Sequence, residues 1–231
     1  MATREELLKV ADDRLHPSLT NHSYLVLRRR SELIREWLKR VPGNALYILE
    51  VGGRYQPYRP LVQHRARQYV ALDILQTPLV DVVGNGESLP FRPGTFDLVI
   101  ATGVLEYFPE PKKPLREIHA VLKPGGFVIA SVAAVCPRAV SEEHWRFLPA
   151  GLRYVFADFA EVEIVPEASS VASFFRYLNW GLSILCRYEP IRQILHHSVV
   201  PCFNLMGLGL ERLANSQNDN LTGNYSVIAR K

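Results

Sequence analysis

Acidic and glycine residues stand at two positions where they could bind a nucleoside. Glu50 is followed closely by Gly52 and Gly53, and Asp73 comes later, each at the end of a short apolar run. The glycines permit a ligand to approach the backbone, and an aspartate carboxylate can accept hydrogen bonds from ribose hydroxyls. Glycine is also common in any tight turn, and an aspartate can simply cap a helix. Together, about twenty residues apart, the two features favour a nucleoside site.

The loop after Gly53 lacks the further glycines of a dinucleotide-binding loop. The G-x-G-x-x-G pattern places a pyrophosphate on the N-terminus of a helix. In this chain Gly53 is followed by Arg54, Tyr55, Gln56 and Pro57. The sequence therefore disfavours NAD and predicts a nucleoside without phosphate groups.

Short, continuous apolar runs alternate with helical stretches through the middle of the chain. The runs expected to be strands are residues 45–50, 69–74, 80–83, 96–101 and 127–132. Runs that are apolar throughout indicate strands covered on both faces. The alternation predicts an α/β fold, an open parallel sheet with helices on both faces, whose ligand site lies at the carboxyl ends of the strands.

Three helices are expected beside these strands. Residues 22–40 have apolar side chains spaced for one helix face, and Pro42 and Gly43 follow them. A short helix is expected near residues 61–68. A stronger one covers residues 114–122, and the Lys123-Pro124-Gly125-Gly126 turn should end it.

The last third of the chain is expected to contain two further strands and an insertion between them. Residues 162–165 and 224–231 are apolar enough to be strands, and residues 168–220 separate them. Gly181 and Pro201 are expected to break this insertion into helical pieces. We expect residues 215–220, at its end, to form an exposed loop.

The insertion is rich in aliphatic and aromatic residues, among them Phe174, Phe175, Tyr177 and Trp180. One interpretation is a helical cap packed on the sheet. The other is an apolar surface within residues 168–213 that contacts a membrane or a second subunit, because large apolar patches usually mark contacts.

Composition excludes several classes of protein. The formal charge of +4 is too small to predict a nucleic-acid partner, and the Arg28-Arg29-Arg30 run suits a solvated helix face or an acidic partner surface. Three widely spaced cysteines predict neither disulfides nor a zinc site. The charged N-terminus is unlike a signal peptide, and no apolar run is long enough to span a membrane. We therefore expect a cytoplasmic location.

Several motifs along residues 45–165 resemble one known family. The series ILEVGG, YVALDI, SLPF, FDLV, VLEY and VLKPGG is similar to the class I S-adenosylmethionine-dependent methyltransferases, and among them to the methyltransferase type 11 subgroup. The resemblance implies a Rossmann-like, mostly parallel seven-stranded sheet with a helical insertion before the last strand, which would pair antiparallel. It also implies S-adenosylmethionine as the cofactor.

The resemblance assigns roles to individual residues. Glu50, Gly52 and Gly53 would pack against the methionine part of the cofactor, and Thr102 would lie near the sulfonium. The remaining residues would bind the ribose and adenine, namely Asp73, Ile74, Asn85 and Gly86. The domains would be residues 1–44 (N-terminal helical segment), 45–167 (cofactor-binding core), 168–220 (helical insertion) and 221–231 (last strand).

Two residues depart from the family pattern. Asn85 replaces a common aspartate, but its carbonyl can still accept a hydrogen bond from the adenine amino group. Arg54 replaces a glycine, so its side chain must either point away from the ligand or block it. The following QPYRPLV run is similar to a subgroup tied to polysaccharide or cell-surface glycan assembly, which favours a cofactor loop that is altered but retained.

Methyl transfer requires orientation above all, because the nucleophile attacks the methyl group in line. An oxygen acceptor would also benefit from a base, for which His144 is the best-placed candidate and Glu106 and Tyr107 are weaker ones. His144 could instead only hydrogen-bond its own loop. The adjacent His196 and His197 diverge on a helix, so no metal is expected.

The sequence thus predicts a methyltransferase acting on a small molecule or a glycan precursor. The alternative is a methyltransferase-like protein that has lost catalytic turnover and acts in binding or assembly. Arg54, at the position of a family glycine, is the reason to consider it.

Overall fold

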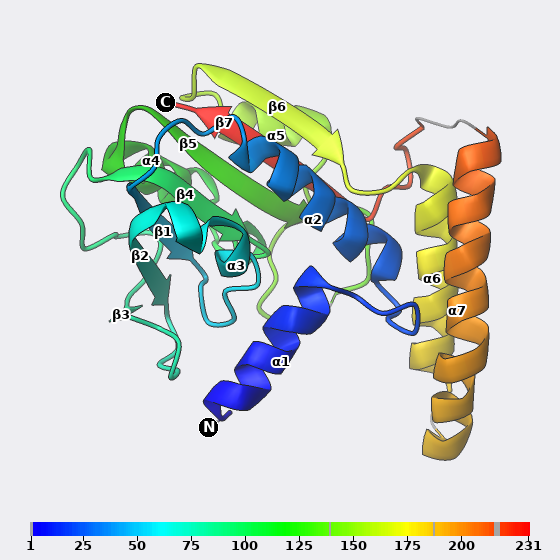
Figure 1. The fold of residues 1–231 in the computed structure, drawn as a ribbon. Helices are drawn as coiled ribbons and strands as arrows, with labels where there is room; N and C mark the ends of the chain where they lie inside the picture. The colour runs from blue at the N-terminus through cyan, green and yellow to red at the C-terminus, as the bar shows by residue number, and fades with distance from the viewer. Residues whose placement is uncertain (1, 139, 187, 215–217) are drawn as a thin grey trace.

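The computed structural model describes residues 2–138, 140–186, 188–214 and 218–231. Their strands form one sheet in the order β3-β2-β1-β4-β5-β7-β6 (Figure 1). Only β7 runs antiparallel to its neighbours. The strands are β1 (Leu46–Val51), β2 (Ala66–Asp73), β3 (Val82–Val83), β4 (Phe96–Thr102), β5 (Leu122–Ala133), β6 (Glu161–Pro166) and β7 (Asn224–Arg230). The predicted α/β class and mostly parallel seven-stranded sheet are confirmed.

The helices flank this sheet and extend beyond one end of it (Figure 1). They are α1 (Arg4–Leu15), α2 (Tyr24–Leu38), α3 (Arg59–Val62), α4 (Lys112–Val121), α5 (Pro149–Val155), α6 (Ser170–Leu185) and α7 (Glu189–Ala214), with short 3-10 turns η1 (Gln63–Arg65) and η2 (Leu105–Tyr107). None of these helices is long and apolar enough to cross a membrane within the described residues.

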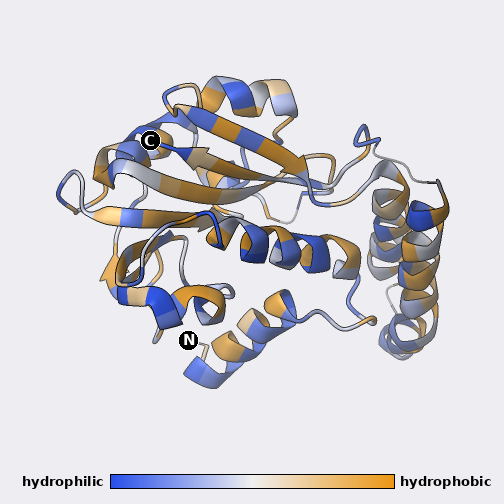
Figure 2. Cartoon of the chain, turned by 45° about the horizontal axis from the view of Figure 1, so that its top comes forward, coloured by the Kyte–Doolittle hydropathy of each residue, from blue (hydrophilic) through white to orange (hydrophobic). Residues whose placement is uncertain are grey.

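Two apolar layers hold the central strands. On one face, Ile34 and Trp37 of α2 pack against Ile48 of β1 and Ile100 of β4. On the other face, side chains of α4 and α5 pack against alternate residues of the same strands, such as Val99. The central strands are mostly coloured as hydrophobic in Figure 2, whereas the edge strand β6 and helix α2 alternate. Continuous apolar runs were the correct signal, because both faces of the sheet are covered.

The helix expected at residues 61–68 is wrong in length. Helical structure ends with η1 at Arg65, and β2 begins at Ala66. Ala66 and Gln68 pair with consecutive residues at the start of β1, with a register shift between the two pairs. Pairing along the neighbouring strand therefore determines the conformation of these residues, and their local helical pattern does not.

The lysine-proline-glycine-glycine motif is not a separate turn after α4. The helix ends at Val121, and residues 122–126 already belong to β5. The Lys123 ammonium lies 2.8 Å from both carboxylate oxygens of Asp97, while Gly125 takes a φ of +75° that a residue with a side chain rarely adopts. The motif thus forms the irregular beginning of a strand.

The helical insertion forms one antiparallel hairpin of α6 and α7, and the predicted breaks at Gly181 and Pro201 are wrong. Both residues lie inside long helices, because packing between helices outweighs local propensity. The break falls instead after Leu185, where Cys186 is extended and Pro190 occupies the start of α7, a position that favours proline. Of the loop expected at residues 215–220, positions 215–217 lie outside the described residues; Asn218 and Asn220 are exposed.

A buried ion pair fixes the base of the hairpin to the sheet. Arg30 of α2 donates three side-chain hydrogen bonds to Glu167, which follows β6, and the hydroxyls of Ser131 and Ser226 also donate to this carboxylate. The Glu167 side chain is completely buried. Removing one member of such a pair would leave a buried, unpaired charge, so α2 and β6 are strongly coupled.

Candidate functional site

A cleft of about 680 Å³ opens at the carboxyl ends of β1, β2, β3 and β4. This is the edge of the sheet where the strand order reverses, and pockets of a few hundred cubic ångströms are typical of small-molecule sites. The described residues that line it are Arg14, Val51, Gly52, Arg54, Tyr55, Leu72, Asp73, Ile74, Leu75, Gly84, Asn85, Gly86, Glu87, Thr102, Gly103, Val104, Tyr107, Phe108, Pro109, Val140 and Glu142.

Glycines keep the floor of the cleft open. Gly52 has a φ of +76°, and its N–H and that of Gly53 both donate to the Leu72 carbonyl. A Cβ atom at Gly52 would lie 2.9 Å from the Val104 side chain, and one at Gly86 would lie 2.7 Å from the Phe108 ring. Larger residues at these two positions would therefore push the loops apart or fill the cleft.

Asp73 presents a carboxylate from the end of β2. The residue is only 7% exposed, and its two oxygens accept hydrogen bonds from the backbone N–H of Leu75 at 2.9 Å and of Arg54 at 3.3 Å. These bonds hold the carboxylate in one orientation, and each oxygen keeps a further lone pair for a ligand. The arrangement can accept from a diol.

Apolar and amide groups line the cleft beyond Asp73. Ile74 is 70% exposed although it is a large apolar residue, so its side chain offers a flat ligand surface that no described protein group covers. The Asn85 carbonyl accepts from the Glu87 backbone at 3.0 Å, which orients the amide. Gly86 and Thr102 complete this set of predicted residues in the cleft.

Glu50 and Gly53 do not line the cleft. The Glu50 carboxylate is buried and accepts from the Tyr69 hydroxyl, and burial raises the pKa of this carboxyl to about 7. Gly53 is buried against β2, where a Cβ atom would lie 3.0 Å from the Ala71 side chain. Both residues support the loop from beneath, and their predicted contact with a ligand stays a prediction.

His144 does not line the cleft either. The residue is exposed, and its backbone N–H donates to the Glu106 carbonyl at 2.8 Å. Its neighbours Val140 and Glu142 do line the cleft. The indole of Trp145 donates to the Phe108 carbonyl at 3.0 Å, so the segment after β5 is attached to the turn after β4. The role of His144 as a base stays a prediction.

Glu106 lies buried beneath this attachment. One carboxylate oxygen accepts from the Ala133 N–H at 2.5 Å, whereas Oε2 is buried without a hydrogen-bond partner among the described residues. Burial raises the pKa of this carboxyl to about 7. Glu106 therefore holds the loops after β4 and β5 together, and Tyr107 beside it faces the cleft.

Arg14 and Tyr55 line the cleft although the motifs did not predict them. Arg14 comes from α1, and its guanidinium carbon lies 4.4 Å from the centre of the Tyr55 ring. The guanidinium carbon of Arg54 lies 5.2 Å from the same ring. The Arg54 side chain thus lies along the cleft beside an aromatic ring. No sequence signal links α1 to this loop, because only the packing of the helix brings Arg14 there.

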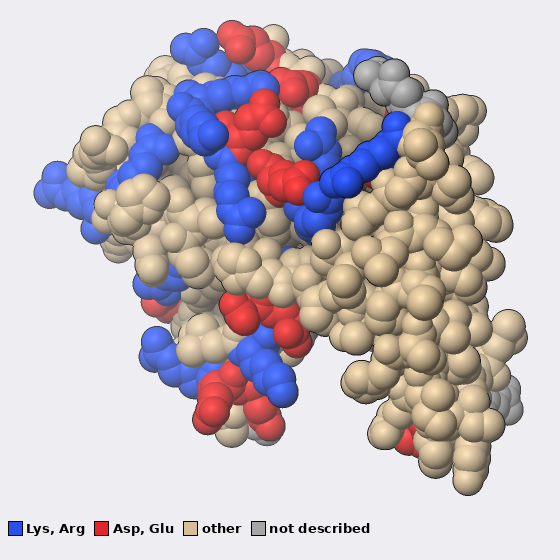
Figure 3. Space-filling view, turned by 45° about the vertical axis from the view of Figure 1, so that its right-hand side comes forward, with Lys and Arg blue, Asp and Glu red and all other residues tan. Residues whose placement is uncertain are grey.

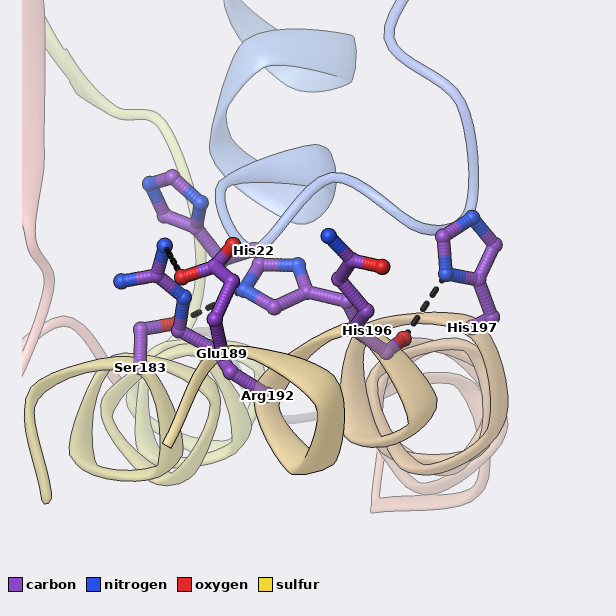
Figure 4. A pocket seen from close by; sticks show the side chains of 7 residues that line it. His22, Ser183, Glu189, Arg192, His196 and His197 are labelled. Carbon is purple, nitrogen blue, oxygen red and sulfur yellow. Dashed lines mark hydrogen bonds and ion pairs between the residues drawn. The ribbon is translucent and has the colours of Figure 1, made fainter. Parts of the chain in front are cut away.

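A second, smaller cavity of about 350 Å³ lies between the hairpin and the segment before α2 (Figure 4). His22 faces His196 across it, Ser183 is 3.1 Å from His196, and Arg192 pairs with Glu189. His197 is turned towards the Gln193 carbonyl. In the part of the chain that the structure describes, no three His, Cys, Asp or Glu residues are arranged to hold a metal.

Residues 49–130 match the family model described as a methyltransferase domain. This segment runs from within β1 into β5 and includes the carboxyl ends of all four strands that end at the cleft. Over these residues the chain is therefore similar to a methyltransferase domain, and this similarity supports S-adenosylmethionine as the cofactor.

Two relatives match over very different lengths. The 2-methyl-6-phytyl-1,4-hydroquinone methyltransferase 1 of Oryza sativa subsp. japonica is 40% identical over 62 residues, which cover 27% of this chain and 18% of that protein. Malonyl-[acyl-carrier protein] O-methyltransferase 1 of Coxiella burnetii is 26% identical over 208 residues, 86% of this chain and 68% of that one. This chain thus spans about a fifth of the length of the first relatives.

Solved structures of this fold include one with a different chemistry. The [4+2]-cyclase SpnF superimposes with a TM-score of 0.53 at 19% identity, covering 87% of this chain and 80% of that one. At this identity the likeness establishes the fold alone, so the activity has to be argued from the site.

Proposed function

We propose that the protein transfers a methyl group from S-adenosylmethionine to a small molecule or a glycan precursor. The observation that carries the proposal is the cleft, in which the oriented Asp73 carboxylate lies between the glycine floor at Gly52 and the exposed face of Ile74. Asp73 would accept from the ribose hydroxyls, and Ile74 and Asn85 would contact the adenine. Gly52 and Thr102 would border the methionine part.

The residues of the chain have to supply orientation and, for an oxygen acceptor, a base. S-adenosylmethionine supplies an electrophilic methyl group on its sulfonium sulfur. Holding the acceptor in line with that methyl group accounts for much of the rate that such a site can provide, roughly 7–11 kcal/mol in favourable cases. His144 would take the acceptor proton, because its imidazole is exposed and its neighbours Val140 and Glu142 line the cleft.

The exposed apolar surface of the hairpin favours an acceptor that is lipophilic or located at a membrane. Ten of the 22 large apolar side chains that are exposed in the described residues lie between Phe174 and Leu213. The face of the hairpin in Figure 3 is almost free of charged side chains. A relative named for a phytyl-substituted hydroquinone is consistent with such an acceptor. We propose that this surface contacts a lipid bilayer at the membrane periphery; a second copy of the chain is the alternative occupant.

The competing function is a role in binding or assembly, carried out by a methyltransferase-like protein without catalytic turnover. The presence of Arg54 favours this alternative, because the family has a glycine at this position and Arg54 carries a charged side chain. Its guanidinium lies beside Tyr55 at the side of the cleft, which leaves the floor at Gly52 open and favours the enzyme.

Calorimetry with S-adenosylmethionine, S-adenosylhomocysteine and NAD tests the proposal. We expect binding of the first two nucleosides in the micromolar range and none of NAD, because the cleft lacks a phosphate-binding loop. A folded sample that binds neither S-adenosyl compound at millimolar concentration would contradict the proposed methyltransferase activity. Binding without methylation of any quinol or glycan precursor would favour the alternative.

A further inference from the structure

Two arginines share one aromatic ring at the side of the cleft. Arg14 approaches the Tyr55 ring from α1, with 4.4 Å between its guanidinium carbon and the ring centre, and Arg54 approaches the same ring at 5.2 Å from the loop after β1. Both residues line the cleft. Two like charges are therefore brought together at the wall of a ligand site.

Neither guanidinium has a carboxylate partner among the described residues. Other arginines of the chain do, as Arg30 has Glu167 and Arg146 has Glu143. For Arg14 the structure gives no side-chain hydrogen bond, and for Arg54 it gives only the backbone N–H bond to Asp73. Arg14 is exposed as a residue, but the atoms packed around its guanidinium, followed by the charge of Arg30, lower its pKa. An anion between the two groups would remove this electrostatic cost.

The pair comes from different elements than the residues that would contact the base. Ile74 and Asn85 follow β2 and β3, whereas Arg14 and Arg54 belong to α1 and the loop after β1. Tyr107 lines the same cleft as Arg14 and Arg54. Burial raises the pKa of the Tyr107 hydroxyl, and the charges of Arg54 and Arg14 oppose this rise. This side of the cleft is the one nearest Gly52 and the turn after β4.

We propose that Arg14 and Arg54 form an anion subsite on the Tyr107 side of the cleft, which holds a carboxylate or phosphate group of the ligands. The inference rests on the proposed function. Guanidinium groups recognise such oxygens through paired hydrogen bonds, and Arg14 stacked on Tyr55 is preorganised to do so. The anion has two sources, the α-carboxylate of the methyl donor or an acidic group of the acceptor.

The first arm of the test compares two nucleosides that differ in the carboxylate. S-adenosylhomocysteine carries the amino-acid group, and 5′-methylthioadenosine lacks it. If the donor supplies the anion, Arg14→Gln and Arg54→Gln should each weaken S-adenosylhomocysteine roughly 10- to 100-fold and leave 5′-methylthioadenosine within about threefold. Arg14→Lys should lose less, since it keeps the charge. Arg153→Gln, on an exposed position of α5 outside the cleft, is the matched control.

The second arm uses inorganic phosphate and malonate as probes, with and without saturating S-adenosylhomocysteine. If the acceptor supplies the anion, the probes should bind the nucleoside complex of the parent, and both glutamine variants should lose this binding while their nucleoside affinities stay unchanged.

Two outcomes overturn the subsite. In one, both variants bind the nucleosides and the probes like the parent. In the other, they remain folded but lose both nucleosides equally, which indicates that the arginines support the cleft and do not bind an anion. If the parent protein binds neither nucleoside, the proposed function is contradicted. The probe experiment without nucleoside then still tests the subsite. Probe binding that depends on the two arginines supports the subsite, and no such binding overturns it.

Discussion

Asp73 is the residue on which nucleoside binding should depend most. Asp73→Ala removes the acceptor of charge-assisted hydrogen bonds worth about 1.5–3 kcal/mol, so we expect a loss of roughly 10- to 100-fold in S-adenosylhomocysteine affinity by calorimetry. The same carboxylate orders Arg54 and Leu75. Asp73→Asn, which keeps one oxygen acceptor, should therefore lose less. An alanine variant with the affinity of the parent would mean that the ribose lies elsewhere.

Glu106 should make the stability of the protein depend on pH. Its pKa of about 7 in the folded state lies above the ordinary value of 4.5, so the folded protein binds a proton more tightly than the unfolded chain. The free energy of unfolding should then fall as pH rises from about 4.5 to 7, by an amount on the order of 1–3 kcal/mol.

The comparison of Glu106→Gln with the parent isolates this group. We expect the midpoint of thermal unfolding to fall less in the variant than in the parent between pH 5 and pH 8. Glu50, with a pKa of about 7, and His22, with a pKa lowered by burial to about 4, titrate in both proteins and cancel. Parallel pH profiles would show that the buried carboxyl does not have the raised pKa.

The loop between β1 and α3 requires glycine for geometry as well as for space. Gly52→Ala should lower S-adenosylhomocysteine affinity at least roughly tenfold, because the residue has a φ of +76° and the new Cβ would press on Val104. Gly94→Ala is the matched control. It has a similar φ of +66°, but no atom lies within 4 Å of the new Cβ.

Both alanine variants should lose about 1 kcal/mol of stability by denaturant unfolding, because both strain a left-handed backbone. Only Gly52→Ala should lose affinity. Equal affinities in the two variants would mean that the loop adjusts without affecting the ligand.

Strands were easier to predict from sequence than the irregular elements. β1, β4 and β5 are covered on both faces, and their apolar runs indicate this directly. The KPGG motif was misplaced because the same residues suit a helix end and a strand with a glycine kink. The breaks expected at Gly181 and Pro201 were wrong because packing of α6 on α7, which a single helix pattern cannot express, stabilises both helices.

The candidate site was predictable where it lies on strand ends and unpredictable where it depends on tertiary packing. Asp73 and Gly52 follow apolar runs, so parallel pairing brings them together. Arg14 reaches the cleft only because α1 packs beside it. His144 is close in sequence to Val140 and Glu142, which line the cleft, but it does not line the cleft itself. Spacing along the chain carries no information about either.

The apolar hairpin predicts how the whole molecule interacts. Leu185, which is 83% exposed, and Ile194 should enter a bilayer of phosphatidylcholine and phosphatidylglycerol. We expect Leu185→Glu and Ile194→Glu to lower the fraction that cosediments with vesicles, by roughly tenfold in partitioning, without changing nucleoside affinity. Leu8→Glu on α1, also at an exposed apolar position, is the control.

Sedimentation velocity without lipid tests whether a second copy of the chain, and not a lipid bilayer, covers this surface. If the parent is a dimer and the same two variants are monomers, the hairpin joins two copies. If vesicle binding and oligomeric state are the same in all variants, the surface has neither role.

The position of β7 also bears on the order in which the chain folds. β6 pairs with β7 alone within the described structure, and β7 follows it only after the whole hairpin. While the chain is being synthesised, β6 must therefore wait without a strand partner until the ribosome has released the segment beyond Asn224, and β5 keeps an open edge for the same time. Such delayed, non-local pairing slows folding and exposes a strand to aggregation. The ion pair between Arg30 of α2 and Glu167, which follows β6, involves no residue of β7 and could therefore hold β6 against α2 before β7 is available.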